Sequence, residues 1–194
     1  MKKWLIGALL VAIVGLVWIA PTYNNMIPLR NKVEQTVGEM QFQYQRRADL
    51  IPAIVQSVSA QVKGEKETFT QVAEARAKAT SIQLTAEALK DPKAMEAYAA
   101  NQATLAGALG KLLSIQEKYP DLKQSEAFNQ ARVTLEETEN RIKFARKEFN
   151  TAVKAYNDKR DPFPANVATL VVGMPHLASF QASADAQNMP AVNF

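Results

Sequence analysis

The amino-acid sequence predicts an all-α protein with an N-terminal transmembrane helix, a long antiparallel up-down-up-down helical bundle and an irregular C-terminal tail. Residues 4–20 contain no charged side chain, which is the first observation behind this prediction. From residue 29 onward, apolar residues recur at intervals of three and four, the period of an amphipathic helix. The chain has 7 glycines among 194 residues and 47% hydrophobic residues, a composition that suits a helical protein with a buried core. We therefore divide it into a cytoplasmic stub with the anchor (1–22), a helical bundle (23–160) and a proline-containing tail (161–194).

The anchor is expected to cross the membrane once. About 17 residues of helix span roughly 25 Å, the lower limit for the hydrocarbon core of a bilayer. Trp4 and Trp18 stand near its ends, where aromatic side chains favour the membrane–water interface. A cleaved signal peptide is the alternative, but bulky Trp18 two positions before Ala20 and Pro21 directly after it make a poor cleavage site. The sequence therefore favours an uncleaved anchor.

Positive charges on the two sides of the anchor predict its orientation. Lys2 and Lys3 precede it, whereas the nearest positive charges after it are Arg30 and Lys32. Lysine and arginine close to a membrane helix tend to stay in the cytoplasm. We expect a single-pass membrane protein with its N-terminus in the cytoplasm and its helical domain extracytoplasmic. In a bacterium with two membranes, this means the inner (cytoplasmic) membrane, with the helical domain in the periplasm.

One face of the anchor carries small residues, which let membrane helices approach each other closely. They follow one another at intervals of four and three: Ala8, Ala12 and Gly15. This face predicts a homo-oligomer that packs through its membrane helices. The alternative interpretation is that alanine and glycine are simply common in such helices.

The bundle is predicted to begin with a helix over residues 29–62, whose apolar residues form a heptad-like seam of the coiled-coil type. Pro52 lies inside this helix and should kink it or begin a new one. Lys63 and Gly64 are typical of a helix end, with a cation in the last turn and a glycine just beyond it. The sequence supports a first break at either Pro52 or Gly64.

Three further helices are predicted. The second covers residues 65–89, and Asp91 and Pro92 begin a third that ends at Tyr119, directly before a proline. The fourth covers residues 121–160. Two long helices and two short ones fit an up-down-up-down bundle, and a three-helix arrangement whose first helix continues past its glycine is the alternative. The tail is expected to be partly extended, with a disordered end.

A polar stripe follows the apolar seam of the fourth predicted helix. At about 100° of rotation per residue, its members fall within about 20° of one line; they are Glu139, Arg146, Asn150 and Asn157. They form either a solvated flank or a buried polar ladder that fixes the register of the helices. In the first helix a charged cluster either binds an anionic partner or pairs across the bundle; it consists of Arg46, Arg47 and Asp49.

The antiparallel arrangement of the two long helices predicts a contact between the stripe and the cluster. With the ends of these helices aligned, Glu139 lies beside Arg46 and one step from Arg47. We therefore expect an ion pair from Glu139 to one of these arginines. The other members of the stripe should lie against polar stretches of the first helix, with Asn150 near Gln35 and Asn157 beside Pro28.

No catalytic site is predicted. The chain contains no cysteine and one histidine, His176, which excludes disulfides, thiolate chemistry and a multi-histidine metal site. The sequence has no glycine-rich phosphate loop, paired-carboxylate signature or serine elbow. The net charge is +4, but both signs are mixed along the chain, so nucleic-acid binding has little support. We expect a protein that is not an enzyme and has no cofactor.

Motifs spread over nearly the whole chain resemble the LemA family of bacterial membrane proteins. The resemblance rests on Tyr23-Asn24, Leu29-Arg30-Asn31-Lys32-Val33, Arg46-Arg47-Ala48-Asp49-Leu50-Ile51-Pro52, Glu139-Asn140-Arg141-Ile142, Phe149-Asn150 and Tyr156-Asn157. It implies an N-terminal transmembrane helix, an antiparallel helical bundle and no established enzymatic activity. It also implies a role in the cell envelope, since the family includes proteins of magnetosome membranes and is discussed alongside a membrane metalloprotease and TPM-domain proteins.

The function that these observations favour is a membrane-anchored helical scaffold of the bacterial cell envelope that self-associates. The alternative is an adaptor that presents partners to an envelope protease or a TPM-domain protein. The expected partners are the lipid bilayer, further copies of the chain and an envelope protein. A scaffold should form discrete large homo-oligomers, whereas an adaptor should be small alone and gain mass only with its partner.

Overall fold

A computed structural model describes residues 2–181, and for residues 2, 3, 5 and 8–16 it describes the backbone alone. Over this range every regular element is a helix, and no strand occurs. The predicted all-α fold is confirmed.

Helix α1 (Lys2–Ser59) is 58 residues long and continues through three prolines, Pro21, Pro28 and Pro52. The first break follows at residues 60–65, where Gly64 adopts a φ of 123° that glycine tolerates and other residues avoid. The predicted break at Gly64 is therefore confirmed. The expectation that Pro52 could begin a new helix is wrong.

A side chain from a neighbouring helix compensates for Pro52. Proline lacks the amide hydrogen that would bond to the carbonyl of Ala48, four residues earlier. That carbonyl instead accepts a hydrogen bond of 2.9 Å from Nε of Arg76. Ala48 is 1% exposed, so an unpaired carbonyl at this position would be costly. Helix α1 thus passes the proline because helix α2 supplies the missing donor.

Helix α2 (Lys66–Ser81) is shorter than the predicted second helix, which extended to residue 89. After Ser81 the chain folds back over α1, where the side-chain amide of Gln41 donates a hydrogen bond of 3.1 Å to the carbonyl of Leu84. Leu84 and Leu89 are both 6% exposed, so this crossing contributes to the core. Tertiary packing therefore ends a segment that its own sequence pattern would continue as a helix.

Helix α3 (Pro92–Ser114) follows the 3₁₀ turn η1 (Ala88–Lys90) and begins where the sequence predicted. The carboxylate of Asp91 accepts a hydrogen bond of 2.9 Å from the amide of Lys93 and so caps the helix. A second 3₁₀ turn, η2 (Ile115–Glu117), then leads out of α3.

The fourth predicted helix is divided in two by Ser125. Helix α4 (Pro120–Gln124) is a single turn, and α5 (Glu126–Arg160) carries the remaining 35 residues. The hydroxyl oxygen of Ser125 accepts a hydrogen bond of 3.4 Å from the amide of Phe128 and so caps α5. An internal N-cap is thus the reason for the break.

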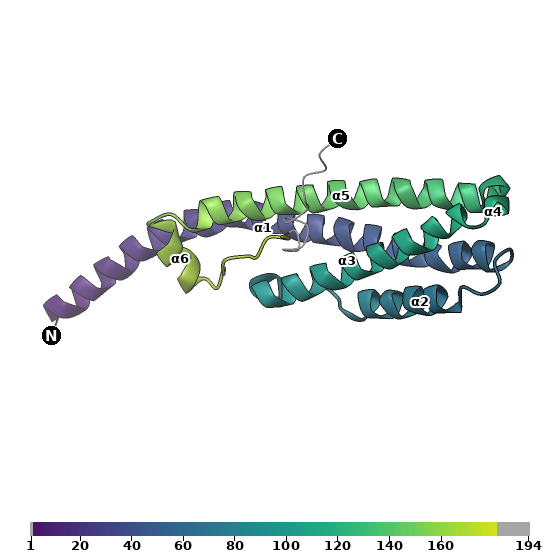
Figure 1. The fold of residues 1–194 in the computed structure, drawn as a ribbon. Coiled ribbons are helices and arrows are strands. Elements are labelled where there is room, and N and C mark those ends of the chain that lie inside the picture. Colours follow the sequence, from purple (N-terminus) through teal and green to yellow (C-terminus); the bar gives the residue numbers. More distant parts are fainter. Residues whose placement is uncertain (1, 182–194) are drawn as a thin grey trace, which may run out of the picture.

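The long helices α1 and α5 lie side by side and run in opposite directions (Figure 1). The shorter helices α2 and α3 pair with each other and lie at the end of the bundle remote from the N-terminus (Figure 1). The α3–α5 connection, through η2 and α4, is at that same remote end.

The C-terminal part combines one short helix with an extended segment. Helix α6 (Ala165–Val171) packs against α1 and α5, so the expectation of a purely irregular tail is wrong there. Residues 174–181, which we name the C-terminal strap, have no regular secondary structure and return along the bundle. The predicted disordered end, residues 182–194, lies outside the described residues.

The buried side chains form two apolar clusters, one in each half of the bundle. The cluster nearer the N-terminal arm includes Met26, Met40, Phe149 and Tyr156 together with Met174, Leu177 and Phe180 of the C-terminal strap. The remote cluster joins α1, α2, α3, α4 and α5, and includes Ile54, Val72, Leu109, Leu122 and Phe128. Helix α3 therefore contributes to both clusters, whereas α2 covers the long helix pair only in the remote half and the C-terminal strap only in the other half.

The N-terminal arm is the part of α1 that projects beyond the bundle (Figure 1). Within the described residues, no helix combines the length and the apolar character needed to cross a membrane. The side chains of the predicted packing face lie outside the described ones; they are Ala8, Ala12 and Gly15. Of the described side chains in the arm, Trp4, Ile6 and Val17 are exposed.

Replacing Arg76 with methionine removes the hydrogen bond to the Ala48 carbonyl, and we expect it to lower the free energy of unfolding by about 1–3 kcal/mol. In a Pro52→Ala background the amide of residue 52 can reach the same carbonyl, so the Arg76 substitution should then cost clearly less. Urea denaturation of the full chain in mild detergent would measure all four members of this double-mutant cycle. An equal loss in both backgrounds would show that Arg76 acts independently of the proline.

Candidate functional site

The buried guanidinium of Arg47 lies between the two apolar clusters. Arg47 is 2% exposed. Its Nη1 donates to Oε1 of Glu139 on α5 at 2.9 Å. Its Nη2 donates to the side-chain oxygen of Gln102 on α3 at 2.6 Å and to the backbone carbonyl of the same residue at 3.1 Å. Arginine suits this position because its donors are held in one rigid plane.

Gln102 extends these contacts to a fourth helix. Its side-chain amide donates a hydrogen bond of 3.0 Å to the carbonyl of Ala79 in α2. We name Arg47, Glu139, Gln102 and the Ala79 carbonyl the arginine network. Because it connects α1, α5, α3 and α2, this network fixes the register of these four helices at one level of the bundle.

The arginine network is partly open to solvent on the side of Glu139, whose side chain is 30% exposed, whereas the side chain of Arg47 is 2% exposed. The buried Nε of Arg47 has no hydrogen-bond partner. The guanidinium also lies 5.2 Å from the centre of the Tyr44 ring, which adds a cation–π contact. With its other donors engaged inside the bundle, Arg47 has a structural role and does not face an external ligand.

The three residues of the predicted charged cluster have different partners in the structure. Glu139 forms the predicted ion pair with one of the two arginines, and its partner is Arg47, one step from the Arg46 that the register placed directly beside it. Arg46 is half-buried on the flank of α1, where its charge lies near Glu137. The pKa of Glu137 is lowered, first by its hydrogen bond from Arg141 and to a smaller extent by Arg46. Asp49 is exposed and accepts a hydrogen bond of 2.7 Å from Gln45.

The two asparagines of the polar stripe bind the C-terminal strap. Asn150 donates to the carbonyl of Phe180 and accepts from its amide, both at 2.8 Å. Asn157 makes the same pair of bonds with Leu177, at 2.8 and 3.1 Å. The predicted register placed these asparagines near Gln35 and Pro28 of α1, but the strap supplies their hydrogen-bond partners.

The distance between the two asparagines on α5 matches the distance between the two strap residues that they bind. Seven residues of helix separate Asn150 from Asn157, and three residues of extended chain separate Leu177 from Phe180. Both intervals cover about 10 Å, given the rise per residue of a helix and of extended chain. The strap therefore runs antiparallel to α5 and is held at two points. The sequence left a solvated flank and a buried polar ladder as alternatives for the polar stripe, whose members are half-buried in the structure, and nothing in their spacing identified the strap as the partner.

The ring of Phe180 packs the strap against the bundle at the level of the arginine network. Its ring lies 6.5 Å from that of Tyr44 and 6.4 Å from that of Tyr98, and Arg146, the remaining member of the stripe, lies 4.1 Å from its centre. Burial raises the pKa of Tyr44 to about 12 and also raises the pKa of Tyr98. Both phenols are therefore neutral at physiological pH and belong to the core.

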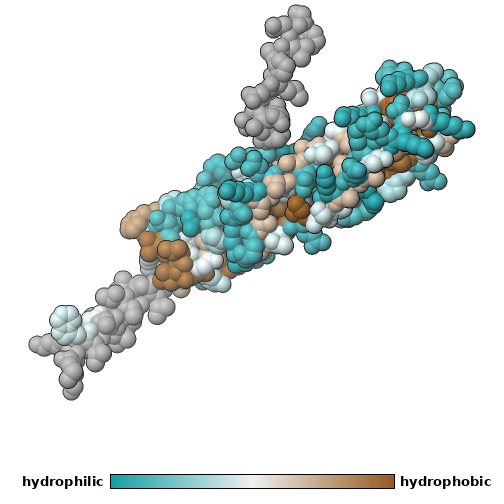
Figure 2. Space-filling model, turned by 60° about the horizontal axis from the view of Figure 1, so that its bottom comes forward, coloured by the Kyte–Doolittle hydropathy of each residue, from teal (hydrophilic) through white to brown (hydrophobic). Residues whose placement is uncertain are grey.

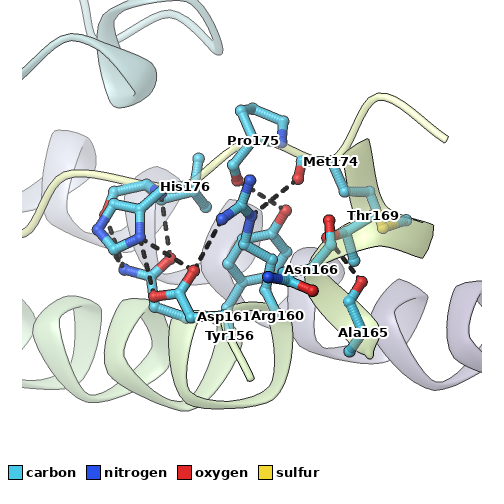
Figure 3. A network of polar contacts seen from close by, with 11 residues as sticks. Tyr156, Arg160, Asp161, Ala165, Asn166, Thr169, Met174, Pro175 and His176 are labelled. Atoms are coloured by element: carbon cyan, nitrogen blue, oxygen red, sulfur yellow. Dashed lines mark hydrogen bonds and ion pairs between the residues drawn. The ribbon is translucent and has the colours of Figure 1, made fainter. Parts of the chain in front are cut away.

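A second polar network holds the beginning of the strap to the end of α5 (Figure 3). Arg160 donates to the carbonyl of Met174 at 3.2 Å, and the Tyr156 hydroxyl donates to that of Pro175 at 3.0 Å. Nδ1 of His176 lies 3.1 Å from the carboxylate of Asp161. Hydrogen bonding to Arg160, and next to His176, lowers the pKa of Asp161.

Two surface clefts lie beside these networks. The first has a volume of about 450 Å³, and Phe42, Tyr98 and Gln102 contribute to its walls. The second has a volume of about 360 Å³ and is bounded by α1, the segment after α2 and the start of the strap. Its charged side chains form two pairs of opposite sign, Arg30–Glu34 at 3.0 Å and Glu87–Lys90 at 2.8 Å. These pairs leave the second cleft without an excess of either charge.

Among the described side chains, no group of three or more histidine, aspartate and glutamate residues could hold a metal ion. His176 is largely exposed, with 59% of its side chain accessible, and its polar contacts are with Asp161 and Asn157. The arginine network and the polar contacts of the strap join the helices and the strap into one body.

Comparison with known proteins gives one family and three relatives. A family model described as the LemA family matches residues 36–194 of the chain, in agreement with the motifs in the sequence. The chain is 30% identical over 74 residues to the magnetosome proteins MamQ 2 and MamQ 1 of Paramagnetospirillum magneticum (strain ATCC 700264 / AMB-1). It is 29% identical over 73 residues to the magnetosome protein MamQ of Magnetospirillum gryphiswaldense (strain DSM 6361 / JCM 21280 / NBRC 15271 / MSR-1). Each match covers 38% of this chain and 27% of the relative.

Replacing Glu139 with glutamine removes the charge that faces Arg47 and should lower the free energy of unfolding by about 1–3 kcal/mol, because Arg47 is then buried without its counterion. Thermal unfolding of the full chain, followed by circular dichroism, would measure the loss. Glu137→Gln is the matched control, since it breaks an exposed ion pair with Arg141 on the same helix and should lower the midpoint much less, because exposed pairs contribute only about 0–1 kcal/mol. If both variants unfold alike, the ion pair has no special structural role.

Replacing both Asn150 and Asn157 with alanine should release the strap from α5. Amide hydrogen exchange at Leu177 and Phe180 should then become at least about tenfold faster, since each lost hydrogen bond contributes about 1 kcal/mol or more. Asn129→Ala serves as the control, because this asparagine binds the carbonyl of Lys123 at the other end of α5. Unchanged protection in the double variant would mean that apolar packing alone holds the strap.

Proposed function

The chain belongs to the LemA family, and from this premise we propose that it is a membrane-tethered helical scaffold of the bacterial cell envelope that self-associates and carries no catalytic activity. The observation that carries this proposal is the continuity of α1. One helix of 58 residues contains both the uncharged segment 4–20 and the first seam of the bundle. A continuous helix transmits the orientation of its anchored end to the bundle.

The proposed anchor is residues 4–20 of α1, which cross the inner membrane once with the N-terminus in the cytoplasm. The absence of charge from this segment and the lysines before it support that orientation. The buried core begins further along the same helix at Met26, which is 0% exposed. The matched relatives are magnetosome proteins, which supports an association with membranes. The chain spans about a quarter of the length of these relatives in each match.

The proposed self-association has two candidate surfaces. One is the small-residue face of the anchor, formed by Ala8, Ala12 and Gly15. The other is on the bundle, at Phe42 of α1 or at Phe144 of α5, which are 61% and 64% exposed. The pairing of Arg47 with Glu139 places the two rings at a similar level along the bundle, and Phe42 borders the first cleft. Exposed phenylalanines on a rigid body are a common feature of protein contact surfaces.

The second candidate function is an adaptor for an envelope protease or a TPM-domain protein. The two clefts favour it, because a partner segment can enter a groove between α1 and the crossing that follows α2. The two functions differ in a measurable way. A scaffold assembles without any other protein, whereas an adaptor gains mass only when its partner is added.

The assembly state of the purified full chain in mild detergent would test the scaffold. We expect discrete homo-oligomers by light scattering, and Ala12→Leu combined with Gly15→Leu should reduce their mass because close approach of the backbones is lost. Gly7→Leu is the control, since Gly7 is off that face and no atom lies within 4 Å of the position of its added Cβ. A monomer in the unaltered chain would contradict the scaffold and favour the adaptor. An unchanged oligomer mass in the double variant would show that the bundle, and not the anchor, makes the contact between copies.

A further inference from the structure

Helix α6 presents an apolar surface to the outside. Val167, Leu170 and Val171 are 48%, 75% and 69% exposed, and Phe163 just before the helix is 82% exposed. These four side chains are the apolar foot. The three in α6 follow the i, i+3, i+4 spacing of one helix face. Figure 2 shows apolar side chains gathered at the end of the body next to the N-terminal arm.

The polar side chains of this stretch point inward instead. Thr169 is 0% exposed and donates its hydroxyl to the carbonyl of Ala165 at 3.0 Å (Figure 3). Asn166 is half-buried, and its side-chain oxygen is fully covered. Residues 162–175 contain no charged side chain. Helix α6 thus buries Thr169 together with Ala168 and leaves its larger apolar side chains outside, where polar groups usually lie.

The position of α6 indicates what covers the apolar foot. Helix α6 packs against α1 at the end of the bundle from which the N-terminal arm projects (Figure 1). If residues 4–20 lie in a bilayer, this end of the bundle lies at its surface. Lys159, in the last turn of α5 next to the foot, is exposed, whereas Arg160 is half-buried and paired with Asp161 at 2.8 Å. An apolar surface beside an exposed lysine suits the boundary between acyl chains and anionic headgroups.

We propose that the apolar foot of α6 inserts into the surface of the same membrane in which the N-terminal arm is anchored. The inference rests on the proposed function, because the arm brings the foot to the bilayer. A helix of 7 residues is too short to cross a membrane, so it lies in the interface. The foot then gives the bundle a second contact with the bilayer, and two contacts fix its tilt where one anchor would allow it to swing.

Single cysteines can test this placement, because the chain contains none of its own. The full chain is reconstituted into vesicles of phosphatidylcholine and phosphatidylglycerol, with an environment-sensitive fluorophore at Leu170→Cys. Val133→Cys, on an exposed site of α5 in the remote half of the bundle, is the matched control. Val17→Cys reports on the arm. Quenching is compared between nitroxide-labelled lipids and iodide in the water.

We expect the lipid-borne quencher to act on position 170 several-fold more strongly than on position 133, with the reverse order for iodide. Quenching at 170 by iodide alone would overturn the proposal, since the foot would then face water. Protection of position 170 from both quenchers would also overturn it and would indicate coverage by a second copy of the chain. Lipid quenching at position 17 without lipid quenching at position 170 would support the proposed anchor and contradict the insertion of the foot. Absence of lipid quenching at both positions would contradict both the proposed anchor and the insertion of the foot.

Discussion

The arrangement of the helices depends on the buried guanidinium of Arg47. A charge that is 2% exposed needs partners in fixed positions, because water cannot substitute for them. Glu139 and Gln102 fill these positions from two other helices, and Gln102 extends the contact to α2. Apolar seams alone permit helices to slide by a turn, whereas this set of directional bonds is satisfied in one register. The network thus gives the bundle a unique alignment.

The two halves of the bundle are organised around this level in different ways. Beyond it, α2 and α3 cover the long helix pair and bury the remote cluster. On the side of the N-terminal arm, the C-terminal strap covers the pair together with the crossing after α2 and the first turns of α3, and the strap contributes Met174, Leu177 and Phe180 to the core. Phe180 meets Tyr44 and Tyr98 where the two coverings join. A strap is sufficient there because asparagine side chains satisfy its backbone polar groups.

The chemistry of the described residues is used mainly to hold the fold together. Arginine, asparagine and tyrosine side chains that resemble site residues in the sequence have partners inside the protein, as Arg76 does with the carbonyl freed by Pro52. Surfaces remain available for partners, including the two exposed phenylalanines and the apolar side chains around α6. A body of this kind, continuous with an uncharged arm, is suited to holding other molecules in place.

The sequence by itself determined the helical class and the start of α3, and it limited the first break to Pro52 or Gly64 and the partner of Glu139 to Arg46 or Arg47. These features follow from local rules: apolar periodicity, capping residues and the alignment of the ends of the two predicted long helices. Only the tertiary structure decided the early end of α2, the passage of α1 through Pro52 and the strap that binds Asn150 and Asn157. Each of these depends on a donor, an acceptor or an apolar surface supplied by residues distant in the sequence, which no local pattern encodes.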